Sequence, residues 1–214
     1  MNRLFKYFSI FGILLVFAAY FFRLFEVNGF VKAIAAIESP SRYYQTMGII
    51  YKIDYFFIAL IMVSCLVSFI LMNKENKKTP LFSVSLIPLA VAILEKIYIV
   101  SASNIVLKNT MGQNISIVNI VNIVILSLGL LSIINSILVK KFMNDRPLFF
   151  AFSMFSIASM LGSTFISVYI AAVGTASVHF IIYTVFILLA LGLFITEFIL
   201  KYRNKDIVVV EEKQ

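Results

Sequence analysis

Two adjacent charged residues, Glu95 and Lys96, lie within an otherwise apolar run from Leu81 to Val100. A charged side chain at the centre of a bilayer costs about 2.5–3.5 kcal/mol on insertion scales, and such residues mark ion or substrate pathways or pair with one another. Pro88 shares a helical face with Glu95, because seven steps of 100° bring the two positions within about 20°. A proline removes the helical hydrogen bond to the carbonyl of Val84, and a free carbonyl beside a carboxylate can form an ion or proton site.

The alternative chemistry at Glu95 is an ion pair with Arg23. Arg23 follows the first apolar run, and two helices that cross the membrane in the same direction would bring it to the depth of Glu95, which we place in the outer third of the bilayer. A guanidinium within reach keeps a carboxylate ionised, while the Lys96 ammonium extends toward the interface. The residues favour this structural pair over an ion or proton site and leave both open.

His179 begins the last apolar run and shares a helical face with Tyr183 and Glu197. An imidazole there could titrate near neutral pH beside a path, or could simply contact water at the start of the helix. Since the chain has one histidine and one cysteine, Cys65, a Cys/His metal or catalytic site is close to excluded. No nucleotide-binding loop, nucleophile elbow or metalloprotease motif is present. We therefore expect no enzyme activity, no cofactor and no metal site.

Two runs carry polar residues without charge at helical spacing. The run 115–139 contains Asn119 and Asn122 on one side, and the run 145–173 contains the serine stripe Ser156, Ser163 and Ser167. Small and hydroxyl-bearing residues let membrane helices approach closely, and Asn or Ser side chains hydrogen-bond across the contact. We expect the two helices to pack on each other, or on a second subunit, through these faces. A hydrophilic passage lined by the same residues is the alternative.

The composition predicts a helical membrane protein. The chain is 62% hydrophobic and 13% charged, whereas a soluble domain is about half apolar and a quarter charged. Its apolar runs have the length that crosses a bilayer: residues 7–22, 55–72, 81–100, 115–139, 145–173 and 179–200. We predict an all-α integral membrane protein with six transmembrane helices.

The connections complete this plan. Residues 1–206 form one polytopic membrane domain and residues 207–214 a short cytoplasmic tail. The connection of residues 25–54 is the longest, and its apolar part, residues 31–37, suits a short helix lying at the interface; an ordinary loop is the alternative. Residues 101–113 are expected to be a polar connection.

The charge of +8 is explained by topology. Twelve of the 18 Lys and Arg residues lie on the side of the membrane that holds both termini, in short clusters between apolar runs. The positive-inside rule then places both termini in the cytoplasm. The partners expected are the lipid bilayer and either other membrane subunits or further copies of the chain, with no nucleic acid. The frequent Ile, Asn and Lys residues indicate an AT-rich genome and a bacterial plasma (inner) membrane.

Two functions fit these features. The first is a transporter, or the membrane subunit of a transport system, which would use an ion gradient or a separate ATPase because the chain shows no soluble nucleotide-binding domain. The second is a non-transporting structural or accessory subunit of a membrane complex. In the first, Glu95 should face a cavity within one chain; in the second, the serine stripe should lie in an intermolecular contact.

The topology predicts which introduced thiols an external reagent reaches. With Cys65 replaced, a cysteine at Asn109 should react with a membrane-impermeant maleimide added outside, and one at Asn76 should not, because the charge rule puts them on opposite sides. Mass spectrometry of the labelled protein measures both. The reverse pattern would contradict the orientation.

Overall fold

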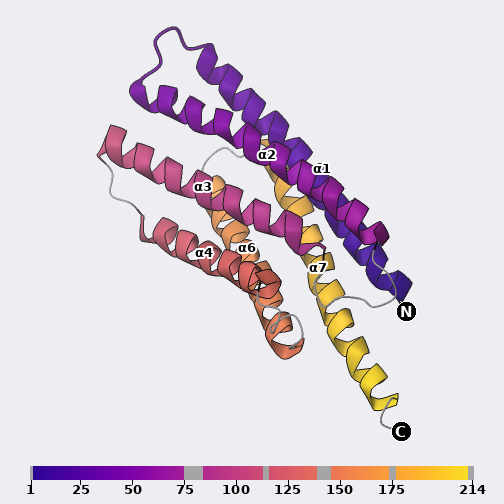
Figure 1. The fold of residues 1–214 in the computed structure, drawn as a ribbon. Coiled ribbons are helices and arrows are strands. Elements are labelled where there is room, and N and C mark those ends of the chain that lie inside the picture. The colour runs from indigo at the N-terminus through magenta and orange to yellow at the C-terminus, as the bar shows by residue number, and fades with distance from the viewer. Residues whose placement is uncertain (1, 75–83, 113–115, 139–145, 174–176, 212–214) are drawn as a thin grey trace.

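The computed structural model describes residues 2–74, 84–112, 116–138, 146–173 and 177–211 (Figure 1). Within this part of the chain every regular element is an α-helix. In chain order these are α1 (Asn2–Ala35), α2 (Arg42–Lys74), α3 (Leu86–Met111), α4 (Ile117–Leu138), α6 (Arg146–Val173) and α7 (Val178–Glu211).

All six of these helices are long and apolar enough to cross a membrane. Large apolar side chains are exposed on all of them, as expected where lipid replaces water around the bundle; examples are Phe11, Phe56, Leu94, Val124, Phe165 and Leu189. The predicted all-α architecture with six helices of membrane-spanning length is therefore confirmed, and these helices indicate a polytopic membrane protein. Figure 1 shows the first turn of α1 and the last turns of α7 at the same end of the bundle.

The helices form a closed ring. Each helix packs on the next in the order α1, α2, α3, α4, α6 and α7, and the most extensive contact, between α1 and α7, joins the two ends of the chain. A further contact between α3 and α6 crosses the ring. One continuous core receives buried side chains from every helix, among them Ile13, Ile58, Ile93, Leu126, Ile157 and Phe194.

The first three helices are longer than predicted at the end of the bundle opposite the termini. The interfacial helix expected at residues 31–37 is wrong, because α1 continues without a break to Ala35 and α2 already begins at Arg42. Residues 101–113 were expected to be a connection but are helical to Met111. A small apolar cluster explains both extensions: the side chains of Met47, Ile50 and Val106 are buried there.

The ends of two helices have clear local causes. Gly112 ends α3 in the left-handed conformation (φ 63°), and its N–H donates to the carbonyl of Lys108, which is the arrangement that glycine favours after a helix. The hydroxyl of Ser177 accepts the N–H of Phe180 at 3.1 Å and caps the start of α7. At its other end α7 continues to Glu211, so residues 207–211 of the predicted tail belong to the helix.

Helices α4 and α6 pack on each other through small residues, as their sequences indicate. The hydroxyl of Ser156 donates to the carbonyl of Gly129 on α4 at 3.0 Å. The stripe members Ser156 and Ser163, and Asn122 opposite, are all buried. Ser167 is half-buried, and its hydroxyl donates to the carbonyl of Ser163 on its own helix. Asn119, also half-buried, donates instead to the side chain of Asn104 on α3 at 2.7 Å.

The close approach of α4 and α6 predicts different costs for two glycine-to-alanine changes. A Cβ at Gly129 would overlap the Ser159 side chain and lie 3.7 Å from the backbone of Ser156, whereas a Cβ at Gly162 would meet nothing within 4 Å. Gly129→Ala should lower the free energy of unfolding by about 1–3 kcal/mol, and Gly162→Ala should leave it unchanged or raise it by up to about 1 kcal/mol. Steric-trap or denaturant unfolding in lipid discs measures both. Equal effects would contradict the α4–α6 contact.

Candidate functional site

A buried guanidinium on α1 joins three carboxyl groups. Arg23 is 6% exposed. Its Nη1 donates to Glu26 Oε2 at 2.8 Å, one turn further along the same helix, and its Nη2 donates to Asp54 Oδ2 on α2 at 3.1 Å. Its Nε lies 3.9 Å from Glu95 Oε1 on α3. One side chain of α1 is thereby connected to α2 and to α3.

The two carboxyl groups on α2 and α3 are completely enclosed. Asp54 and Glu95 are both 0% exposed. Glu95 Oε2 accepts a hydrogen bond from the Tyr20 hydroxyl at 3.3 Å, and both carboxyl groups face the guanidinium of Arg23. Glu26 differs from this pair, since 23% of its side chain is exposed. Asp54 and Glu95 thus form an enclosed pair of carboxyl groups, whereas the carboxyl group of Glu26 lies at the edge of the cluster.

Lys96 points to a different neighbour. Its ammonium is 7% exposed and lies 5.0 Å from the ring centroid of Tyr183 on α7, a cation–π distance. The Tyr183 ring in turn packs edge-on against Tyr20, with centroids 5.5 Å apart. Among the described residues, no carboxylate lies within ion-pair distance of Lys96. We call the seven side chains of this cluster the charge network: Tyr20, Arg23, Glu26, Asp54, Glu95, Lys96 and Tyr183.

The charge network lies near the middle of the bundle. Because α3 begins at Leu86 instead of Leu81, Glu95 is only nine residues, or about 14 Å, from the start of its helix. The membrane-spanning part of α3 is 25 residues long, so Glu95 lies toward its centre. The predicted depth was measured from a helix start five residues earlier, at Leu81; the position of Glu95 relative to the bilayer stays a prediction.

Pro88 does not form a site with Glu95. It occupies the first turn of α3, where no helical N–H is required and a proline causes no kink. The carbonyl of Val84 accepts hydrogen bonds from the Ser68 hydroxyl at 3.1 Å and from the N–H of Ile87 at 3.3 Å. The predicted free carbonyl and mid-helix kink are both wrong, for the same reason: the helix starts later than the apolar run.

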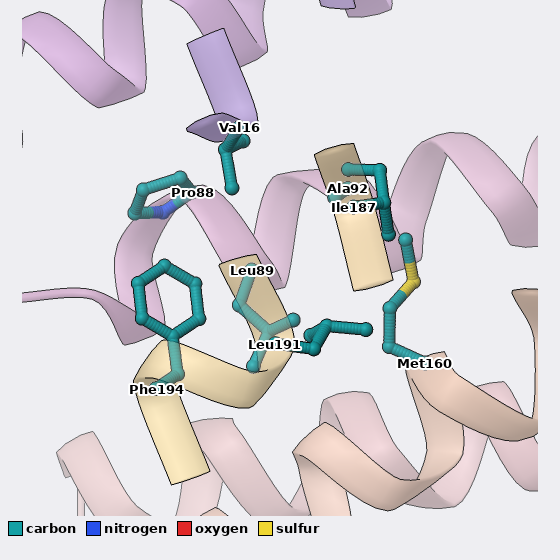
Figure 2. A pocket seen from close by; sticks show the side chains of 8 residues that line it. All are labelled: Val16, Pro88, Leu89, Ala92, Met160, Ile187, Leu191 and Phe194. Atoms are coloured by element: carbon teal, nitrogen blue, oxygen red, sulfur yellow. The ribbon is translucent and has the colours of Figure 1, made fainter. Parts of the chain in front are cut away.

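Pro88 instead lines a small apolar pocket inside the ring. Figure 2 shows side chains from α1, α3, α6 and α7 converging on this space. All eight are apolar, and we call them the apolar layer: Val16, Pro88, Leu89, Ala92, Met160, Ile187, Leu191 and Phe194.

The apolar layer lies directly beside the charge network. On each of three helices a pocket residue and a network residue are one turn apart: Val16 and Tyr20 on α1, Ala92 and Glu95 on α3, Ile187 and Tyr183 on α7. Residues three or four apart lie on the same helical face. The two layers therefore follow each other along the inside of the ring.

A second polar layer lies on the far side of the apolar one. The Ser85 hydroxyl donates to Glu197 Oε2 at 3.1 Å, and both residues are buried, at 1% and 0% exposed. Ser85 precedes Pro88 by three residues on the chain, and Glu197 follows Phe194 by three, so this contact is one turn beyond the apolar layer on both chain segments. Buried carboxylates thus lie at two heights of the ring, with apolar side chains between them.

The predicted site residues separate into two groups. Arg23, Glu95 and Lys96 come together in the charge network, whereas Pro88 belongs to the apolar layer. His179 is exposed at the start of α7, and its ring stacks on Phe25 with centroids 6.0 Å apart. It is one turn from Tyr183 but, within the described residues, makes no hydrogen bond or ion pair with the charged groups of the network.

Sequence reasoning missed Asp54, Tyr20, Glu26 and Tyr183 as members of one site. Asp54 was assigned to a connection, although the residues on both sides of it are largely apolar: Ile49 to Ile53, apart from Lys52, and Tyr55 onward. Extending the second apolar run back by a few residues would have placed this carboxylate inside the membrane. Tyr20 gave no signal, because in an aromatic-rich chain nothing distinguishes a tyrosine that meets a charge. Tyr183 was placed on the face of His179 and Glu197, but not beside Lys96 or Tyr20.

Comparison with known proteins finds no relative of this chain. No protein-family model, curated protein or solved structure matches the chain. The functional argument therefore depends on the contacts of the described residues alone.

The shared guanidinium predicts coupled losses of stability. Removing one partner from a buried ion pair costs about 3–5 kcal/mol, since the other charge is left uncompensated. Glu95→Gln and Arg23→Gln should each lower the free energy of unfolding in lipid discs, with Arg23→Gln costing more because it leaves both Asp54 and Glu95 unpaired. The double variant should lose less than the sum by about 1 kcal/mol or more.

Glu26→Gln provides the matched control for this cycle. Its carboxylate also contacts Arg23, but the exposed position limits the expected cost to about 1 kcal/mol or less. Additive losses for Arg23→Gln and Glu95→Gln would contradict the interaction between the two side chains.

Proposed function

We propose that this chain is a small transporter, or the membrane subunit of a transport system, and that the inside of its six-helix ring is the path. The observation that carries the proposal is the succession of layers along the inner faces of α1, α3 and α7. The charge network comes first, the apolar layer second, and the Ser85–Glu197 contact third.

Stability alone gives a poor account of these buried charges. Replacing a buried ion pair by well-packed apolar residues is often neutral or stabilising, and ionisable residues within membrane helices mark ion and substrate pathways. Here four charged side chains, those of Arg23, Asp54, Glu95 and Lys96, are at least nine-tenths buried in one cluster. A role in moving ions or polar solutes supplies the reason for retaining them.

The apolar layer would act as the closed barrier of this path. Its side chains come from four helices, among them α3 and α6, whose contact crosses the ring. Separation of α1 and α7 from α3 and α6 would admit water to the space between the two polar layers. Such an alternation needs no new secondary structure, since every helix can move as a unit.

The alternative function, a structural or accessory subunit, is less well supported by the position of the serine stripe. That proposal relied on the serine stripe as an intermolecular contact, and Ser156 and Ser163 are buried inside this chain beside α4. The finer parts of our proposal rest on the sequence. They are cytoplasmic termini, a bacterial inner membrane, a non-enzymatic role, and energy from an ion gradient or a separate ATPase.

Opening of the ring predicts that a thiol in the apolar layer reacts with a charged reagent. Ala92 is 2% exposed and lies on the Glu95 face of α3. In a Cys65→Ser background, Ala92→Cys in lipid vesicles should react with a positively charged methanethiosulfonate at least about tenfold faster than Val124→Cys. Val124 is 51% exposed on α4, where lipid prevents thiolate formation.

Mass spectrometry of the modified protein over time measures the two rates. Equal, negligible modification at both positions would contradict an opening path and favour the structural subunit. Circular dichroism and elution volume of the Ala92→Cys variant establish that reaction does not come from unfolded protein.

A further inference from the structure

Two completely enclosed carboxyl groups, those of Asp54 and Glu95, share one guanidinium. Both face Arg23, at 3.1 Å for Asp54 and 3.9 Å for Glu95. An ionised carboxylate is only an acceptor. Carboxyl groups that share an enclosed site can hold one proton between them, because two like charges close together are costly there.

The free oxygens of the pair point to the same conclusion. Asp54 Oδ1 and Glu95 Oε1 are buried and receive no hydrogen bond from any described residue, while the second oxygen of each group is bonded to Arg23 or Tyr20. A buried acceptor without a donor is costly. A proton on either carboxyl group supplies a donor to this region without adding a further side chain.

Arg23 is the cation that contacts these acids within the described residues. Three carboxyl groups contact it, those of Glu26, Asp54 and Glu95, whereas the Lys96 ammonium faces the ring of Tyr183. The other titratable groups around the pair are Tyr20 on α1, Tyr51 on α2 and Tyr98 on α3. A proton on one of the two enclosed carboxyl groups reduces the negative charge that Arg23 alone contacts, which a low-dielectric interior favours.

We propose that Asp54 and Glu95 form a proton-binding pair that takes up and releases one proton during the working cycle. In this step a proton from water adds to a carboxylate oxygen to give a neutral carboxyl group, and its release regenerates the carboxylate. No bond between heavy atoms changes and no redox partner is needed. The assignment of this proton as the coupling ion rests on the proposed transport function, whereas binding of the proton does not.

A metal cation fits the same position poorly. It would lie beside the guanidinium of Arg23 and near the ammonium of Lys96, and like charges at such distances repel strongly in a low dielectric. The described residues also contain no group of three or more His, Cys, Asp and Glu side chains that could hold a metal ion. A proton avoids this repulsion, because it becomes part of a neutral carboxyl group.

Protonation of the pair would change how tightly α1 packs on α2 and α3. Arg23 connects α1 to α2 through Asp54 and to α3 through Glu95. Neutralising one carboxyl group weakens one of these connections and leaves the other, so the proton selects which neighbouring helix α1 holds more tightly. Because Glu95 is one turn from Ala92 on α3, the same change reaches the apolar layer.

Infrared spectroscopy of the full-length protein in lipid discs tests the proton directly. We expect the wild type to show a carbonyl band of a buried, protonated carboxyl group at neutral pH. The band should shift on exchange into D₂O and disappear at alkaline pH. It should be lost in Asp54→Asn and in Glu95→Gln, because either change removes one half of the pair.

Glu26→Gln is the matched control, since Glu26 also contacts Arg23, at 2.8 Å, but is partly exposed; it should keep the band. Absence of a titrating band in the wild type, or its persistence in both pair variants, would overturn the proposal, and the wild-type titration decides even if a variant fails to fold. A titrating band without modification of Ala92→Cys would support the pair and contradict transport. Modification of that thiol without the band would overturn the pair alone.

Discussion

The guanidinium of Arg23 is the interaction on which the centre of this bundle depends. It is the one cation that contacts Glu26, Asp54 and Glu95 within the described residues, and these acids lie on three different helices. In a medium without water, each acid would otherwise have to lose its charge or leave the interior. The positions of α2 and α3 beside α1 are therefore constrained by charge as well as by side-chain volume.

The remaining packing is consistent with this constraint. Lipid gives helices no hydrophobic reason to associate with each other, so contact depends on close approach and polar bonds. The bundle uses both means in different places: small residues bring α4 to α6 at Gly129, and charged or hydroxyl groups join α1, α2 and α3. The most extensive contact, between α1 and α7, then closes the ring around the apolar layer.

Much of the fold could be predicted because apolar length determines it. Six helices follow from six runs of spanning length, and the proximity of Arg23 to Glu95 follows from two parallel helices. The errors arose at helix ends. Helices α1, α2 and α3 continue through polar residues at one end of the bundle, because Met47, Ile50 and Val106 are buried there, and the early start of α2 concealed Asp54. The opposite error occurred at the start of α3, which begins five residues later than the apolar run, so that Glu95 and Pro88 were both placed about one and a half turns too far along the helix.

Lys96 and Arg23 have different partners. Both cations are enclosed and adjacent to the same cluster, but only Arg23 contacts carboxylates in the described structure, whereas Lys96 faces the ring of Tyr183. The planar guanidinium holds several acceptors at once, while the ammonium of lysine is a compact charge on a flexible chain. The chemistry of arginine therefore suits the position that three acids share, and a lysine at residue 23 could not hold Glu26, Asp54 and Glu95 in the same fixed geometry.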